Sequence, residues 1–205
     1  MTLELATPHG PARAHLDLQA QAPGALVLGH GAGGGVAAPD LTAAARAATS
    51  LGWSVVLVEQ PYRVAGRRSP APAAQLDAAW TAVVDRLREH ELAGLPLVAG
   101  GRSSGARVAC RTSAATGVVG VLCVRSNAEA IEMLRLHPNP VCILSRGETR
   151  NETLNGIPVL HLPRDMRTLL GLIGVSPRGG ARKRKRYVHK HVGTRTDSQG
   201  GVWVW

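Results

Sequence analysis

The sequence Gly-Arg-Ser-Ser-Gly at residues 101–105 decides the fold that we predict for this chain of 205 residues. An apolar run at 95–100 comes directly before it, and a helix-like stretch at 106–111 comes directly after it. A G-x-S-x-G pattern between a strand and a helix is typical of a nucleophile elbow, a turn so tight that the residues flanking the serine must be small. We therefore expect Ser103 to project its hydroxyl from the top of a sheet into a cleft. The N-terminus of the following helix would stabilise negative charge at the same place.

Strand and helix patterns alternate around this motif along the first 123 residues. Short apolar or alternating runs predict strands, and apolar residues spaced three to four apart predict helices. The predicted strands are 12–18, 25–28, 55–58, 95–99 and 118–123, the predicted helices are 39–51, 73–90 and 105–116, and a loop is predicted at 60–72. This order predicts the α/β class, with a doubly wound and mostly parallel sheet whose active face lies at the carboxyl ends of the strands.

The first apolar strand ends in a second motif, the segment Gly-His-Gly-Ala-Gly-Gly-Gly at residues 29–35. A backbone so rich in glycine can point its N–H groups at an anion. One interpretation is half of an oxyanion hole. The other is a dinucleotide site, because three of the glycines fit G-x-G-x-x-G and Glu59 closes the next strand. In a dinucleotide site the helix opens at the glycines, whereas helix signals here begin only at Pro39, so we favour the oxyanion hole.

Residues 10–123 resemble the α/β-hydrolase superfamily, in particular the small bacterial hydrolases related to dienelactone hydrolase and the hydrolase-like domains of testis-expressed and chromatin-complex proteins. Three motifs carry the resemblance in order, at residues 28–34, 59–68 and 101–107. The resemblance implies a sheet of the α/β-hydrolase type with Ser103 as the nucleophile. It also implies that the backbone N–H groups of Ala32 and Ser104 form the oxyanion hole.

The same resemblance implies a triad acid after a later strand and a catalytic histidine in a loop further on. Neither motif is present in its usual form after Cys123. The nearest counterpart of the acid is Asp165, at the end of the segment 156–165. The candidate base is His191, with His189 as an alternative in the same basic segment. The other interpretation is that both histidines belong to a solvated tail.

The residue composition changes abruptly after residue 123. Residues 1–123 contain no Ile, Asn or Lys, whereas the last 82 residues contain four Ile, four Asn and three Lys. We therefore divide the chain into an α/β-hydrolase-like core, 1–123, and a divergent basic C-terminal region, 124–205. A frameshift, a fusion or a truncated gene would explain the change, and a variable region with a disordered end is the alternative. The predicted sheet would then be incomplete at its C-terminal end, and its uncovered edge would favour self-association.

The net charge of +10 lies mainly in the C-terminal region, because the balance of basic and acidic residues is +2 in residues 1–123 and +8 in residues 124–205. The basic run at 182–186 lacks interleaved aromatic residues, so we do not expect a nucleic-acid partner. No apolar run approaches the roughly 20 residues of a membrane helix, and the N-terminus does not resemble a signal peptide. Three cysteines without metal spacing are typical of a reducing compartment. We expect a cytoplasmic protein with no cofactor, no metal and no membrane association.

Two hypotheses for the function follow from these observations. In the first, the chain is a serine hydrolase that acts on a small-molecule ester, thioester or related acyl substrate. In the second, it is a catalytically inactive or truncated hydrolase-like domain that serves as a binding module or has no activity. The elbow favours the first hypothesis, and the lack of recognisable acid and histidine motifs favours the second.

Overall fold

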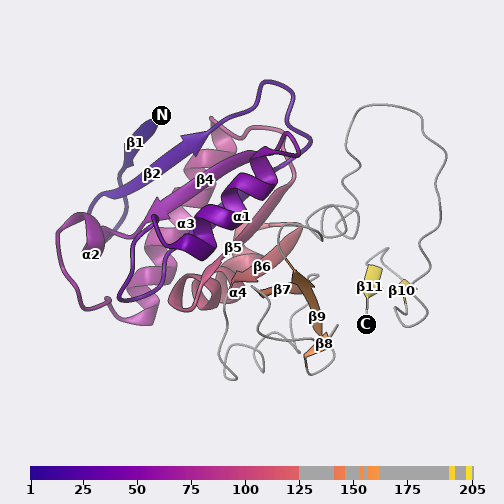
Figure 1. Cartoon of the computed structure of the whole chain (residues 1–205). Helices are drawn as coiled ribbons and strands as arrows, with labels where there is room; N and C mark the ends of the chain where they lie inside the picture. Colours follow the sequence, from indigo (N-terminus) through magenta and orange to yellow (C-terminus); the bar gives the residue numbers. More distant parts are fainter. Residues whose placement is uncertain (125–140, 146–152, 155–156, 162–193, 197–201, 205) are drawn as a thin grey trace.

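The computed structural model describes residues 1–124 in full and, beyond them, the backbone of five strands at 141–145, 153–154, 157–161, 194–196 and 202–204 (Figure 1). The strands of the main sheet are β1 (Thr2–Leu5), β2 (Ala12–Asp17), β3 (Ala25–Gly29), β4 (Ser54–Glu59), β5 (Leu97–Arg102), β6 (Gly120–Val124), β7 (Val141–Ser145), β8 (Thr153–Leu154) and β9 (Ile157–His161). Among the described residues these nine strands lie in the order β1-β2-β4-β3-β5-β6-β7-β9-β8. Two further strands, β10 (Thr194–Thr196) and β11 (Val202–Val204), form a separate antiparallel pair.

The centre of the main sheet is parallel. The neighbouring strands β4, β3, β5, β6, β7 and β9 all pair in parallel, whereas β1, β2 and β8 join the sheet in antiparallel fashion. The predicted α/β class with a mostly parallel sheet is therefore confirmed. Because β7 and β9 extend the parallel sheet, its backbone pairing continues past residue 123, where the composition changes. The division of the chain into two regions at that residue stays a prediction.

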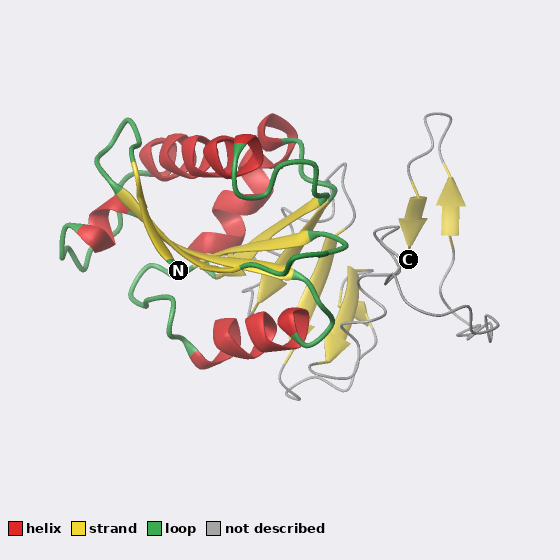
Figure 2. Ribbon diagram, turned by 90° about the horizontal axis from the view of Figure 1, so that it is seen from above, coloured by secondary structure: helices red, strands yellow, loops and turns green. Residues whose placement is uncertain are grey.

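Helices cover both faces of this sheet (Figure 2). Helix α1 (Pro39–Thr49) packs on one face in a buried cluster with residues of β3 and β4. Helices α3 (Ala73–Glu89) and α4 (Ser104–Thr116) pack on the other face in a second cluster. Full burial of one Leu or Val side chain stabilises the fold by about 1.5–3 kcal/mol, so these two clusters hold the layers together. No helix in the described part of the chain is long and apolar enough to cross a membrane.

The local sequence explains where the helices begin and end. Pro39 stands in the first turn of α1, where its missing N–H is not needed, and Gly52 takes a φ of +79° shortly after the helix ends. The apolar side of α3 is buried as its spacing predicts, through Leu76, Ala79, Trp80, Val83, Val84 and Leu87. These side chains recur every three to four residues, which is the period of a helix packed on a sheet.

Strand bounds differ from the sequence-based prediction by up to three residues, and two short elements within residues 1–124 were not predicted. Strand β5 begins at Leu97 rather than at residue 95 and runs on to Arg102, so it includes two glycines of the elbow region. The predicted loop at 60–72 contains a short helix, α2 (Pro61–Val64), because Pro61 at the first position presets φ for a helical turn. Strand β1 was not predicted, since four residues at a sheet edge carry too little pattern to identify.

The topology brings the two glycine motifs together at the carboxyl ends of neighbouring strands. Strands β3 and β5 are parallel neighbours, and Gly29 pairs with Gly101 in the register. The chain passes from β3 through α1 to β4 on one side, and then crosses to β5 on the other side. This reversal is a topological switch point, and ligands of open α/β sheets bind outside the carboxyl ends of the strands at such a point.

Candidate active site

The turn at Ser103 joins β5 directly to α4. Strand β5 ends at Arg102 and the helix begins at Ser104, so Ser103 alone makes the turn. It adopts φ 51° and ψ −108°, and it is the only non-glycine residue with positive φ in the described part of the chain. Such a conformation costs on the order of 1–3 kcal/mol and persists only where the surrounding structure enforces it. The Ser103 side chain is exposed, so its hydroxyl is accessible to a ligand.

Two glycines of the elbow are required by their contact with β3. A Cβ atom at Gly101 would overlap the carbonyl oxygen of Gly29. A Cβ atom at Gly105 would overlap the same oxygen and would also lie 2.8 Å from the carbonyl oxygen of His30. These neighbours are backbone atoms inside a sheet and cannot yield easily. The sequence pattern is thus explained by close packing of the elbow against the end of β3, in addition to the tightness of the turn itself.

The glycine-rich loop at 29–35 lies beside the same turn. A Cβ atom at Gly31 would lie 3.7 Å from Cβ of Ser103 and 3.4 Å from the carbonyl oxygen of Arg102. Ala32 is half-buried, and within the described residues no hydrogen bond engages its N–H. Ser104 is the first residue of α4, and N–H groups in the first turn of a helix have no acceptor within the helix. The two predicted oxyanion donors therefore belong to backbone segments that both adjoin Ser103.

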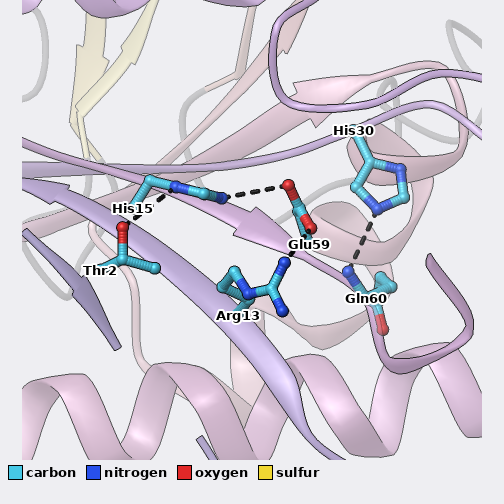
Figure 3. A network of polar contacts seen from close by, with 6 residues as sticks. All are labelled: Thr2, Arg13, His15, His30, Glu59 and Gln60. Atoms are coloured by element: carbon cyan, nitrogen blue, oxygen red, sulfur yellow. Dashed lines mark hydrogen bonds and ion pairs between the residues drawn. The ribbon is translucent and has the colours of Figure 1, made fainter. Parts of the chain in front are cut away.

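His30 is buried beneath this loop and is held at both ring nitrogens. The backbone N–H of Gln60 donates to Nε2 at 3.1 Å, as Figure 3 shows, so Nδ1 carries the proton and donates it to the carbonyl oxygen of Gly31 at 2.8 Å. Burial lowers the pKa of His30 below its usual value of 6.5, against a smaller opposite effect of the hydrogen bond to Gly31. A neutral histidine with both nitrogens occupied shapes the loop and leaves no site to accept the proton of Ser103.

An ion pair with Asp40 holds Arg102 beside the same loop. Its Nε donates to Oδ2 of Asp40 at 2.7 Å, and the Asp40 side chain is only 13% exposed. The Nη1 atom lies 3.4 Å from the position of a Cβ at Gly31 and 3.6 Å from that of a Cβ at Gly34. Asp40 stands in the first turn of α1, so this pair connects α1, the glycine loop and the elbow. Sequence reasoning missed it because the partners are 62 residues apart and neither lies in a charge pattern.

The structure also bears on the dinucleotide interpretation. Helix α1 begins at Pro39, after the glycines, whereas in a dinucleotide site the helix opens within them. The carboxylate of Glu59 is engaged by two side chains of β2 (Figure 3): Nε2 of His15 lies 3.1 Å from Oε1, and Nη1 of Arg13 lies 3.7 Å from Oε2. Both observations favour the oxyanion interpretation of the loop.

The remaining predicted site residues are not among the residues that the structure describes. Asp165 and His191 lie outside the described residues, as does the alternative base, His189. Strand β9 (Ile157–His161) lies within the segment 156–165 that ends at Asp165. An open groove of about 620 Å³ lies elsewhere, between α1 and strands β2 and β4, and its lining includes no residue of the elbow or of the glycine loop.

The strand order, the switch point and the elbow define a protein of α/β-hydrolase architecture. A family model described as an alpha/beta hydrolase domain matches residues 22–125, which is half of the chain, and the chain belongs to this family. This confirms the resemblance noted from the three sequence motifs. A search of curated proteins gave no match.

Solved structures with the same fold include three bacterial proteins. An α/β serine hydrolase without a lid from Xanthomonas campestris is 23% identical, with a TM-score of 0.65 over 85% of this chain and 90% of that chain. An α/β serine hydrolase homologue from Coxiella burnetii is 14% identical, with a TM-score of 0.63 over 85% and 94%. A dienelactone hydrolase from Anabaena variabilis is 15% identical, with a TM-score of 0.60 over 85% and 93%. At these identities the likeness establishes the shared fold.

Proposed function

We propose that the chain is a serine hydrolase that transfers the acyl group of an ester, thioester or related compound to water. The observation that carries the proposal is the placement of Ser103. Its side chain is exposed, its backbone is strained, and it lies between the end of β5 and the beginning of α4. Strained backbone positions cluster at functional sites, where they fix the direction of a reacting group.

In the proposed reaction, Oγ of Ser103 attacks the carbonyl carbon of the substrate and gives its proton to a histidine, for which His191 is our candidate, oriented by Asp165. The N–H groups of Ala32 and Ser104 donate hydrogen bonds to the oxyanion of the tetrahedral intermediate. When the intermediate collapses, the leaving group takes the proton from the histidine and an acyl-serine ester remains. A water molecule, deprotonated by the same histidine, then attacks this ester, releases the acid and restores Ser103.

Two features, one in the elbow and one in the glycine-rich loop, support the oxyanion hole in this proposal. The positive end of the α4 dipole lies at Ser104, where a developing negative charge is stabilised. The Ala32 N–H makes no hydrogen bond within the described residues, so no such bond has to break before it binds an oxyanion. The name of the Anabaena neighbour points to a lactone, an internal ester, and such a compound falls within the proposed substrate class.

The proposal is tested with a fluorophosphonate probe, which reacts with activated serines. We expect covalent labelling of the purified full chain, with loss of labelling in Ser103→Ala and unchanged labelling in Ser50→Ala, a control at an exposed serine that caps the C-terminus of α1. Circular dichroism and thermal melting establish that each variant is folded. Absence of labelling in the folded wild-type chain would contradict the proposal and support the inactive hydrolase-like domain.

A further inference from the structure

The segment that follows β4 returns to the glycine loop through two contacts. The backbone N–H of Gln60 donates to His30, and the hydroxyl of Tyr62 donates to the carbonyl oxygen of Ala32 at 2.9 Å. Tyr62 belongs to α2, a single turn of four residues whose two buried members are Pro61 and Tyr62. This segment belongs to the second of the three sequence motifs, residues 59–68. The proposed reaction assigns no role to that motif.

Tyr62 is well placed to act as a hydrogen-bond donor. Its side chain is almost fully buried, and its ring packs edge-on against the ring of His30, with centroids 5.7 Å apart and an interplanar angle of 64°. Burial raises the pKa of the Tyr62 phenol above its usual value of 10, against a smaller opposite effect of Arg63. The hydroxyl therefore keeps its proton at neutral pH and can donate it in a hydrogen bond to the carbonyl oxygen of Ala32.

Together, His30 and Tyr62 fix the two peptide groups on either side of Ala32. His30 binds the carbonyl oxygen of Gly31, and Tyr62 binds the carbonyl oxygen of Ala32. In a trans peptide the C=O and the following N–H point in opposite directions, so holding the oxygen of Gly31 also sets the direction of the Ala32 N–H. Gly31 and Gly33 flank this residue, and glycine loses more conformational freedom on ordering than any other residue. The order of the loop must therefore come from contacts such as these two.

We infer that Tyr62 is a positioning residue: its hydroxyl holds the peptide group that follows Ala32 while His30 holds the one that precedes it, and together they keep the Ala32 N–H oriented towards the oxyanion before the substrate binds. The inference rests on the proposed function, because it deepens the account of the oxyanion hole. Preorganised donors stabilise a transition state more than donors that must reorient, since they pay no reorganisation energy during the reaction. Loss of the hydroxyl is therefore expected to slow the chemical step and to leave substrate binding nearly unchanged.

The test uses the full chain with Tyr62→Phe, which removes the hydroxyl and keeps the ring. The control is Thr112→Val in α4, which removes a buried hydroxyl donated to the carbonyl oxygen of Val108 at 2.8 Å. With p-nitrophenyl acetate as the probe substrate, we expect Tyr62→Phe to lower kcat by about 10-fold or more, with KM changed by less than about 2-fold. Hydrogen exchange of residues 29–35 should also be faster by about 5-fold or more in Tyr62→Phe, and unchanged in Thr112→Val.

The two readouts separate this inference from the proposed function. If the folded wild-type chain neither turns over the ester nor reacts with the fluorophosphonate, the proposed function fails, and faster exchange in Tyr62→Phe would still show that Tyr62 orders the loop. If the wild-type chain is active and Tyr62→Phe keeps both its kcat and its rate of loop exchange, the inference is overturned. An equal fall of kcat in Tyr62→Phe and Thr112→Val would also overturn it, because it would indicate a general loss of stability.

Discussion

Replacement of Gly105 by alanine gives the sharpest test of how the elbow is packed, because two physical effects predict opposite signs. Gly105 is the second residue of α4. Alanine has a higher helix propensity than glycine, by about 1 kcal/mol in a helix interior, so propensity alone predicts a more stable protein. The structure predicts the reverse, since the new Cβ would overlap the carbonyl oxygen of Gly29 and lie 2.5 Å from its carbonyl carbon and 2.8 Å from the carbonyl oxygen of His30.

The size of the clash decides the sign. Real Cβ atoms almost never approach another heavy atom within 3.0 Å, and here three backbone atoms lie inside that limit. Relief requires the end of β3 to move away from α4, although Gly29 is held in register with Gly101 and Val58. Overpacking of this kind costs about 1–3 kcal/mol, and three backbone contacts place the cost at the upper end. After the gain in propensity, we expect a net loss of about 2 kcal/mol, or about 4–8 °C in Tm for a chain of this length.

The measurement is thermal and urea unfolding of Gly105→Ala beside Gly35→Ala. A Cβ atom at Gly35 would meet nothing within 4 Å, and its φ lies outside the range that favours glycine. Gly35→Ala is therefore expected to leave the stability unchanged or to raise it by about 0.4–1 kcal/mol, through the lower entropy of the unfolded chain. A Tm for Gly105→Ala at or above that of the wild-type chain would refute the close packing of α4 on β3 as the reason for the second glycine.

Two further predictions concern His30 and the proposed acid and base of the triad. Because the pKa of His30 is lowered by burial, the unfolded chain binds a proton more readily than the folded chain, and stability falls as the pH drops below about 6.5, by at most about 1.4 kcal/mol per pH unit. Urea unfolding at pH 7.5 and 5.5 should show this loss in the wild-type chain and a smaller one in His30→Gln, and equal losses would contradict the assignment. If Asp165 and His191 complete the triad, Asp165→Asn and His191→Ala should each lower kcat on p-nitrophenyl acetate by about 10⁴-fold. Activity at the wild-type level in either variant would exclude that residue.

The parts of the site that sequence reasoning predicted are those fixed by local backbone geometry. Ser103 needs a glycine two residues away on each side because of the turn and the neighbouring strand, so the requirement is written into five consecutive residues. The helices α1 and α3 were predicted within two residues at each end, since proline and glycine mark the ends of α1 and a periodic apolar face marks α3. In both cases the signal lies within one segment of the chain.

The parts that sequence reasoning missed depend on contacts between distant segments. Tyr62 reaches Ala32 across 30 residues, and Arg102 reaches Asp40 across 62 residues. Neither pair has a spacing that periodicity or a known motif can reveal, and Tyr62 lies in a segment that was predicted to be a loop. The motif at 59–68 was nevertheless a usable signal, because it is one of the three segments that carry the resemblance to the hydrolase family.

The change of composition after residue 123 affects the fold and the catalysis differently. Pairing of strands uses backbone groups, which every non-proline residue supplies, so β7 and β9 can extend the parallel sheet with an altered set of side chains. A catalytic acid and base have no such tolerance, because each requires one particular side chain at one position, and loss of one triad member removes most of the rate. Belonging to the α/β-hydrolase family therefore does not by itself establish turnover. Labelling of Ser103 would separate the two, because a serine reacts readily with a fluorophosphonate only when a base is in place to accept its proton.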